Sequence, residues 1–193
     1  MYTPSPTGTL FHDLDDGQYF PITVSGTGPH VDFKVIHSPG HTEDSIALAF
    51  PSERVLYTAD SVLGQGTAVF EDLGTYLSSL RTLLSYTDKD TFLYPAHGPV
   101  VLNGERVIRS YIDHRMEREG QILQVLQQAS EDTQGTWSTW EIVSKIYAAY
   151  PPDLWEPASR SVNQHLVKLV AEGRVEKLDG EGTDTKWKLQ TKL

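Results

Sequence analysis

The sequence predicts an α+β protein in which a sheet-containing part is followed by a mainly helical part. Two observations lead to this fold class. The first half of the chain consists of short apolar runs of strand length, separated by turn residues. The second half contains longer segments whose apolar residues recur at helical spacing. The break falls at Asn103-Gly104, so we expect one domain over residues 1–104 and a second over residues 105–193.

In the first part, strands are expected where apolar runs end at turn signals. A helix is expected at about 76–86, where leucines recur every three or four residues. Residues 1–9 form a loose lead-in. The expected strands are a short one entered through Leu14–Phe20, followed by 31–37, 45–50, 54–58 and 91–94. The order along the chain is therefore a run of strands, one helix and a final strand.

The second part is expected to contain three helices followed by a β-hairpin. Ser138 and Glu141 fit a capping box at the start of the middle helix. Pro151-Pro152 ends that helix, and Gly173 ends the third. The expected elements are helices at about 105–128, 136–150 and 156–172 and strands at 174–178 and 185–189. Two helices followed by a hairpin is the order of a winged helix.

Composition and charge exclude several classes of protein. The 193 residues include 16 Lys and Arg and 26 Asp and Glu, which gives a net charge of −10. No cysteine is present, so a disulfide framework, a thiolate zinc site and a cysteine nucleophile are excluded. No apolar run reaches the roughly 20 residues of a membrane helix. Residues 1–8 have neither the basic nor the apolar region of a signal peptide. We expect a cytoplasmic protein with no membrane partner.

Three of the expected strands end in side chains that can bind metal. His41 follows the turn Pro39-Gly40, Asp60 follows the strand at 54–58, and His97 follows the strand at 91–94. A lone histidine on a turn usually has no such role, but three candidates at three strand ends form a pattern. Imidazole nitrogen and carboxylate oxygen suit zinc, manganese or iron, and a carboxylate can bridge two ions.

The motifs that contain these residues resemble those of a known family. PGHT at 39–42, AD at 59–60 followed by LGQGT, and PAHG at 95–98 resemble the third, fourth and fifth motifs of the metallo-β-lactamase superfamily. The run from Gly64 to Leu73 resembles the beta-lactamase-like protein 2 branch and the fungal lactamase-type polyketide thioesterases. The likeness covers nearly all of residues 17–193. It implies the C-terminal half of a metallo-β-lactamase αββα sandwich, followed by a helical linker and a winged-helix domain.

The resemblance also implies a metal site. His41 would bind one ion, His97 would bind the other, and Asp60 would bridge them. The cofactor would be zinc, with up to two ions in the full family site, or manganese. Thr42 and Asp44 would orient His41, unless they only cap the turn. His114 would contact the substrate or the metal domain, unless it only packs the long helix.

The superfamily's upstream HxHxDH cluster has no match in this sequence. Three protein ligands then remain for two ions, whereas zinc usually takes about four ligands in total. We therefore expect an incomplete site, in a chain that begins after the cluster. Without the other half of the sandwich, one apolar face of the sheet has no covering layer, so we expect it to be a surface for self-association.

Three functions remain open. The first is a thioesterase that releases an acyl or polyketide chain from an acyl carrier protein, or acts on a small thioester or ester, in secondary-metabolite biosynthesis. The second is a single-strand endoribonuclease with RNA as the partner. The third is a truncated, catalytically impaired non-enzyme. Residues 1–104 contain 4 basic and 12 acidic residues, which argues against strong RNA binding. We therefore favour a thioesterase for the family type and an impaired protein for this chain by itself.

Overall fold

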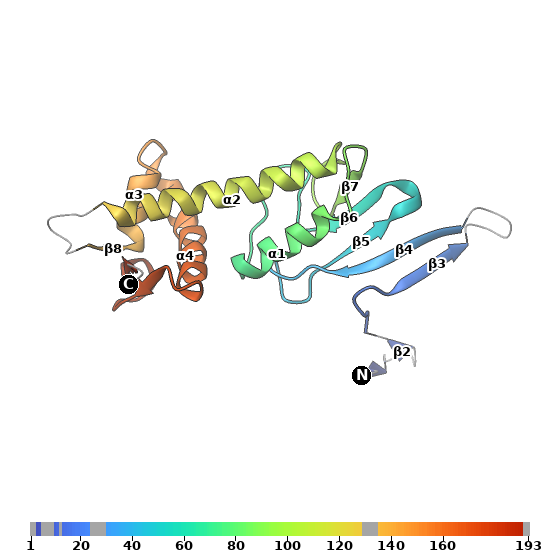
Figure 1. Cartoon of the computed structure of the whole chain (residues 1–193), viewed down its shortest axis with the longest axis horizontal. Helices are drawn as coiled ribbons and strands as arrows, with labels where there is room; N and C mark the ends of the chain where they lie inside the picture. The colour runs from blue at the N-terminus through green and yellow to red at the C-terminus, as the bar shows by residue number, and fades with distance from the viewer. Residues whose placement is uncertain (1–2, 5–9, 12, 24–29, 129–134, 191–193) are drawn as a thin grey trace. The chain divides into compact units, whose positions relative to one another are not determined.

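The computed structural model describes residues 3–4, 10–11, 13–23, 30–128 and 135–190 (Figure 1). The chain divides into two compact units. The first comprises Met1–Phe70 and Thr75–Ser110, and the second comprises Glu71–Gly74 and Tyr111–Leu193. The predicted domain boundary at residue 104 falls at the first residue of the long helix α2 (Gly104–Gln127). In the described residues, no helix is long and apolar enough to cross a membrane.

A five-stranded sheet forms the centre of the first unit, in the order β3-β4-β5-β6-β7. Its neighbours pair antiparallel except for β6 and β7, which are parallel. The strands are β3 (Tyr19–Thr23), β4 (His30–His37), β5 (Ile46–Phe50), β6 (Val55–Ala59) and β7 (Phe92–Pro95). The predicted strands are thus confirmed to within one or two residues. Of the predicted lead-in, β1 (Thr3–Pro4) pairs with β2 (Leu10–Phe11), and its other residues lie outside the described part of the chain.

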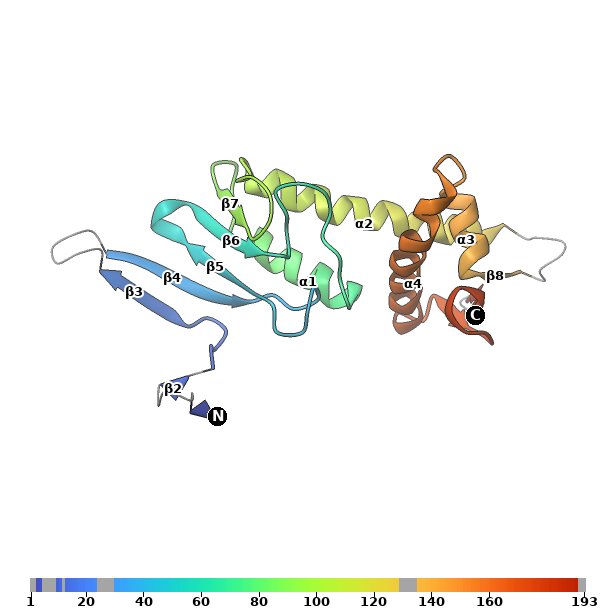
Figure 2. The ribbon, with the colours of Figure 1, turned by 180° about the vertical axis from the view of Figure 1, so that it is seen from behind.

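The two faces of this sheet differ in burial because strand side chains alternate between them. On one face, Ala47, Leu56 and Leu93 are fully buried. The helix α1 (Leu73–Leu84) lies along the sheet in both ribbon views (Figures 1 and 2), and its leucines 77, 80 and 83 are buried. The opposite face is aromatic and apolar, and Phe92 and Tyr94 there remain 42% and 46% exposed. Self-association through this face stays a prediction.

The second unit has the order expected of a winged helix. Its elements are the later turns of α2, then β8 (Thr136–Ser138), α3 (Thr139–Ile146), α4 (Trp155–Ala171), β9 (Val175–Lys177) and β10 (Lys186–Leu189). The three strands pair in the order β8-β10-β9. Its core consists of apolar side chains from all of these elements, including Ile122, Trp137, Ile142, Leu166, Val175 and Trp187.

The predicted capping box is confirmed, but the predicted start of its helix is wrong. The Ser138 hydroxyl accepts a hydrogen bond from the Glu141 backbone N–H, and the Glu141 carboxylate accepts one from the Ser138 N–H. The bond from the Ser138 N–H to the carboxylate, helped by the nearby Lys186, holds the pKa of Glu141 below its ordinary value. The helix therefore begins at Thr139, and Thr136–Ser138 is a strand paired with β10. Pairing of Trp137 with Trp187 buries both indoles, which local helix propensity could not indicate.

His165 and Lys168 of α4 are of residue types that can contact nucleic acid, but both have structural roles in the second unit. His165 is fully buried in the second unit. Lys168 has a side chain only 12% exposed and forms ion pairs with Glu119 and Glu172, both at 2.6 Å. A basic side chain that is already paired inside the protein does not offer its charge to a phosphate. The burial of His165 and the ion pairs of Lys168 therefore stabilise the second unit and do not form a surface for nucleic acid.

We expect the second unit to lose stability in mild acid because of His165. Burial, reinforced by the charges of Arg115, Arg118, Lys168 and His114, lowers the pKa of His165 to about 3. The unfolded chain has the ordinary pKa of about 6.5 and binds the proton first. Stability should therefore be intact above pH 6.5 and fall towards pH 3, by about 1.4 kcal/mol per pH unit from this group.

Urea unfolding followed by tryptophan fluorescence measures this effect, because all four tryptophans lie in the second unit. His165→Gln removes the titrating group, so its free energy of unfolding should depend less on pH than that of the wild type. Equal pH dependence in the two proteins would show that His165 is not the acid-sensitive group.

Candidate metal centre

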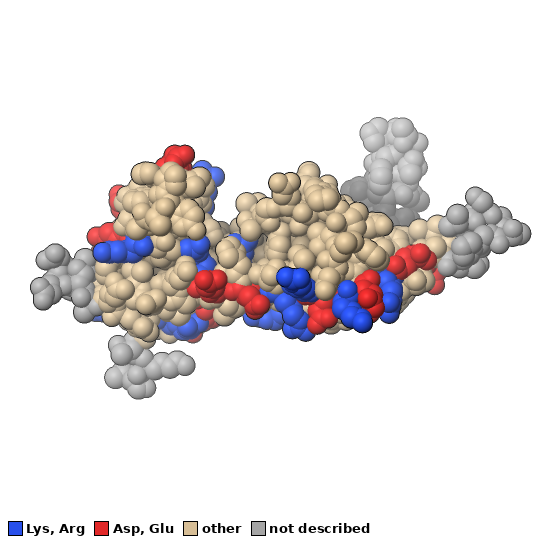
Figure 3. Space-filling view, turned by 90° about the horizontal axis from the view of Figure 1, so that it is seen from above, with Lys and Arg blue, Asp and Glu red and all other residues tan. Residues whose placement is uncertain are grey.

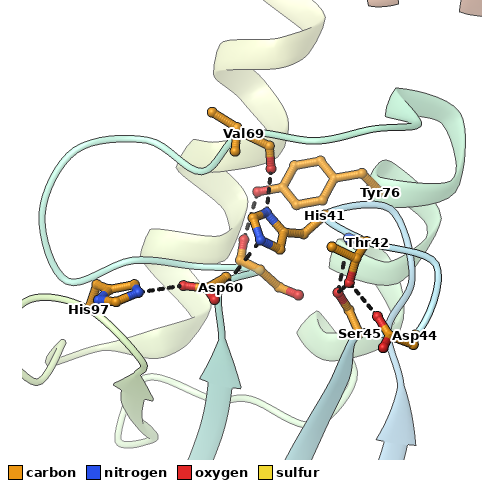
Figure 4. Close-up of polar contacts among 9 residues, drawn as sticks. His41, Thr42, Asp44, Ser45, Asp60, Val69, Tyr76 and His97 are labelled. Atoms are coloured by element: carbon orange, nitrogen blue, oxygen red, sulfur yellow. Dashed lines mark hydrogen bonds and ion pairs between the residues drawn. The ribbon is translucent and has the colours of Figure 1, made fainter.

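His41, Asp60 and His97 converge at one edge of the sheet in the first unit (Figure 4). Nε2 of His41 lies 4.0 Å from one carboxylate oxygen of Asp60, and Nε2 of His97 lies 3.5 Å from the other. The Asp60 carboxylate therefore lies between two imidazoles, each facing a different oxygen. The side chains of His41 and Asp60 are 24% and 34% exposed, and that of His97 is 77% exposed. We call these three residues the ligand rim.

The backbone turns sharply at the end of β6, immediately before Asp60. The register between β6 and β7 shifts at Tyr57 and Ala59, and Ala59 has a φ of +46°. A non-glycine residue in this left-handed region is held there at a cost of roughly 1–2 kcal/mol. The Ala96 N–H donates to the Ala59 carbonyl at 2.9 Å, which ties the loop containing His97 to this turn. Two neighbouring parallel strands thus deliver Asp60 and His97 to the same edge.

Glycines allow the loops on either side of His97 to approach closely. The Gly64 N–H donates to the His97 carbonyl at 2.9 Å. A Cβ on Gly64 would lie 2.0 Å from the Pro99 carbonyl oxygen, and a Cβ on Gly98 would lie 2.8 Å from the Gln65 nitrogen. The glycines of the LGQG and HGP stretches therefore form a backbone-to-backbone contact that holds His97 beside Asp60.

The turn that contains His41 packs directly on helix α1. Gly40 has a φ of +123°, and a Cβ there would lie 2.4 Å from both Cα and N of Tyr76. The Ser79 hydroxyl donates to the Pro39 carbonyl at 2.7 Å. Glycine is required at position 40 for two reasons, since both the backbone conformation and the space exclude a side chain.

The hydrogen bond of His41 determines which ring nitrogen is available to a metal. Nδ1 lies 2.8 Å from the Val69 carbonyl oxygen. A carbonyl only accepts, so in the neutral ring the proton is on Nδ1 and the lone pair is on Nε2. That lone pair faces a carboxylate oxygen of Asp60 at 4.0 Å, an arrangement that a cation between the two atoms would stabilise. The donor types of the rim therefore fit two metal ions with Asp60 as the bridging ligand.

The number of donors does not fit a complete metal cage. Two imidazoles and one carboxylate supply three ligands, and zinc usually takes about four. Among residues 3–4, 10–11, 13–23, 30–128 and 135–190, no group of three or more His, Cys, Asp or Glu is placed to hold one ion. The rim thus has the composition of the bridging part of a two-metal site, and its role as metal ligand stays a prediction.

The other candidate residues have contacts of their own. The Thr42 hydroxyl donates to Asp44 at 2.7 Å and lies 2.8 Å from the Ser45 hydroxyl, contacts that close the turn after His41. His114 lies on the part of α2 that belongs to the second unit, where burial and the charges of Arg115 and Arg118 lower its pKa. Roles for Thr42, Asp44 and His114 towards a metal or substrate stay predictions.

Sequence reasoning missed the residues that support the rim. Val69 acts through its backbone carbonyl, which no side-chain motif reveals. Tyr76 and Ser79 were expected on a helix, but not in contact with the turns at Ser61 and Pro39. The available signal was Gly40, because a glycine directly before a candidate ligand indicates that something packs closely against the turn.

Comparisons with known proteins agree with this fold. A model of the metallo-beta-lactamase superfamily matches residues 1–97. A model of the beta-lactamase associated winged helix domain matches residues 138–187. A beta-lactamase domain protein from Burkholderia ambifaria has a similar structure, with a TM-score of 0.74 and 18% identity over 93% of this chain and 52% of its own. The predicted α+β fold, with a winged helix after the lactamase region, is confirmed.

Two relatives show where the similarity in sequence lies. The Beta-lactamase-like protein 2 homolog of Drosophila melanogaster is 39% identical over 88% of this chain and 54% of its own length. The Atrochrysone carboxyl ACP thioesterase of Aspergillus chevalieri is 29% identical over 91% of this chain and 55% of its own length. The chain spans about half the length of these curated relatives.

Proposed function

Because this chain belongs to the metallo-beta-lactamase superfamily, we propose that its ligand rim is the bridging part of a metal-dependent hydrolase site that acts on acyl thioesters. One observation carries this proposal: the Asp60 carboxylate lies between two imidazole nitrogens at 4.0 and 3.5 Å. Members of the superfamily generally bind metal ions, and the donor types of the rim suit zinc or manganese.

If two metal ions were held at such a rim, the chemistry they would supply is a hydroxide at neutral pH and polarisation of the substrate carbonyl. The chain's own residues would orient that chemistry. Asp60 would bridge the two ions. His41, with its proton held on Nδ1 by the Val69 carbonyl, would present the lone pair of Nε2 to one of them. His97, with a side chain 77% exposed, would lie on the side open to substrate.

The surroundings of the rim favour a neutral acyl substrate over a nucleic acid. The three segments that contain the rim residues (38–45, 60–70 and 96–103) have no Lys or Arg and contain Glu43, Asp44 and Asp60. A phosphate backbone requires cations, and this region supplies none of its own. Two of these segments also expose apolar side chains, Val69 at 71% and Leu102 at 68%. An acyl chain can make contact with such side chains.

The thioesterases among the relatives support the same substrate class. The Aspergillus chevalieri relative is named for an acyl carrier protein (ACP) thioesterase. We extend that activity to the family type of this chain: release of an acyl or polyketide chain from a carrier protein, or hydrolysis of a small thioester. The winged helix adds no clear argument for RNA. On the face drawn in Figure 3, the coloured basic and acidic side chains are intermixed rather than gathered into a basic patch.

Paired assays test the proposal. Thiol release from an acyl-phosphopantetheinyl carrier protein and cleavage of a labelled single-stranded RNA would be measured with and without added zinc. We expect zinc-dependent thiol release that Asp60→Asn abolishes, and intact RNA. RNA cleavage that Asp60→Asn abolishes, without thiol release, would replace the proposal with the endoribonuclease. Absence of both activities would contradict the proposal and support the third candidate, a catalytically impaired protein.

Zinc content is the direct physical prediction. We expect the purified chain to retain less than one equivalent of tightly bound zinc, because three ligands shared by two ions leave each ion under-coordinated. Asp60→Asn should weaken zinc binding at least about 100-fold, or about 2.7 kcal/mol, because it removes the only carboxylate of the rim. Asp90→Asn, the same change at an exposed residue paired with Arg54, should leave zinc affinity unchanged. Two stoichiometric equivalents in the wild type would contradict the incomplete site.

A further inference from the structure

We propose that Tyr76 is the positioning residue of the ligand rim, because its hydroxyl holds the turn after Asp60 and its ring holds the loop that orients His41. Tyr76 lies on α1 and is fully buried. Its role would be to place the ligands, not to bind metal. The inference rests on the proposed function only where it concerns metal affinity.

The hydroxyl acts on the Asp60 side of the rim. It donates to the carbonyl oxygen of Ser61 at 2.6 Å, in a buried environment. Ser61 follows Asp60 directly and is itself 1% exposed. A short hydrogen bond to the next peptide group restricts how the Asp60 backbone can rotate, and therefore where its carboxylate points. The strained Ala59 on the other side, with a φ of +46°, shows that this turn needs an external restraint.

The ring acts on the His41 side of the rim. It stacks on Phe70, with centroids 5.4 Å apart and planes 21° apart. Phe70 directly follows Val69, whose carbonyl accepts the hydrogen bond from His41 Nδ1 at 2.8 Å (Figure 4). Stacking at Phe70 thus places the acceptor that keeps the proton of His41 on Nδ1. Loss of the stack would release that acceptor and let the ring exchange tautomers.

The backbone of the same helical turn supports the approach to His41. Gly40 packs on Tyr76, where a Cβ would lie 2.4 Å from Cα and N. Ser79, three residues further along α1, donates to the Pro39 carbonyl at 2.7 Å. One turn of α1 therefore restrains three separate segments: the turn at 39–41, the turn at 60–61 and the loop at 69–70. A single contact to one segment would be ordinary packing, whereas three segments that all contact the rim indicate a positioning role.

Two variants test the role of the Tyr76 hydroxyl and the role of its ring separately. Tyr76→Phe removes the hydroxyl and keeps the ring. Phe70→Ala removes the stack and keeps Tyr76. Tyr86→Phe is the matched control, because it also removes a tyrosine hydroxyl that is hydrogen-bonded, to Lys34 Nζ at 2.9 Å, but in a different environment. Thermal unfolding of every variant would verify that the fold is retained.

The readouts are the tautomer of His41 and the affinity for zinc. Long-range ¹H–¹⁵N spectra of the metal-free protein at about pH 8 should show the Nδ1–H tautomer in the wild type and Tyr86→Phe, and a mixture in Phe70→Ala. Competition with a chromophoric chelator should show zinc affinity about 10- to 100-fold weaker in Tyr76→Phe and within about twofold of wild type in Tyr86→Phe.

Wild-type zinc affinity in Tyr76→Phe together with an unchanged His41 tautomer in Phe70→Ala would overturn the inference. If the wild type binds no zinc, the proposed function fails, and the tautomer measured without metal then decides this inference alone. A mixture of tautomers in Phe70→Ala would uphold it, and a single Nδ1–H form would refute it.

Discussion

Gly40→Ala is expected to destabilise the first unit by about 4 kcal/mol and to displace His41 from Asp60. Two effects add at this position. The φ of +123° is one that a residue with a side chain rarely adopts, and the new Cβ would lie 2.4 Å from backbone atoms of Tyr76. Neither neighbour is a flexible side chain, so the turn or helix α1 must move. Either movement separates His41 from the carboxylate that it faces at 4.0 Å.

Gly66→Ala is the matched control, because Gly66 also has a positive φ, +78°, but has nothing within 4 Å of an added Cβ. Gly66→Ala should lower the free energy of unfolding only by the conformational strain, roughly 1–2 kcal/mol. Hydrogen exchange of peptides from β4, β5 and β6, followed through urea unfolding, reports on the first unit. Equal destabilisation by the two substitutions would show that the contact between Gly40 and Tyr76 carries no special energetic weight.

Glu119→Gln is expected to destabilise the second unit by about 3–5 kcal/mol. The Glu119 side chain is 3% exposed and accepts from Lys168 at 2.6 Å and from Arg174 at 2.7 Å. It connects α2 to α4 and to the residue that precedes β9. The amide has nearly the same shape as the carboxylate but no charge. The positive charge of Lys168, whose side chain is 12% exposed, would then lie in a poorly solvated position with less negative charge beside it.

Glu172→Gln tests whether burial is the cause. Glu172 pairs with the same Lys168 at 2.6 Å and with Arg174 at 3.4 Å, but its side chain is 39% exposed. Solvent screens such a pair, so its loss should cost less than about 1 kcal/mol. Urea unfolding monitored by tryptophan fluorescence measures both variants. A cost at Glu119 no larger than that at Glu172 would contradict the importance of the buried pairs.

Much of the fold could be predicted because local patterns and tertiary structure agree. The leucines of α1 recur at helical spacing and are buried on one side of that helix. The strands β4 to β7 end at the turn signals that predicted them. The capping box at Ser138 and Glu141 formed as expected, since it depends only on residues three positions apart.

Elements that depend on distant partners could not be predicted in the same way. The strand β8 exists because Trp137 pairs with Trp187, fifty residues along the chain, and its own sequence equally suits the start of a helix. The ion pairs of Glu119 join residues about fifty positions apart. The carbonyl of Val69 has no sequence signature at all, although it determines which nitrogen of His41 is free.

The sequence alone identified the candidate donors: two imidazoles and a carboxylate that follow three strands, without cysteine and without Lys or Arg in the same segments. The tertiary structure decided whether these groups meet, because convergence requires the parallel pairing of β6 with β7 and the packing of Gly40 on Tyr76. Donor chemistry belongs to each side chain alone and can be read residue by residue. Distances between donors depend on long-range backbone contacts, which exist only once the chain has folded.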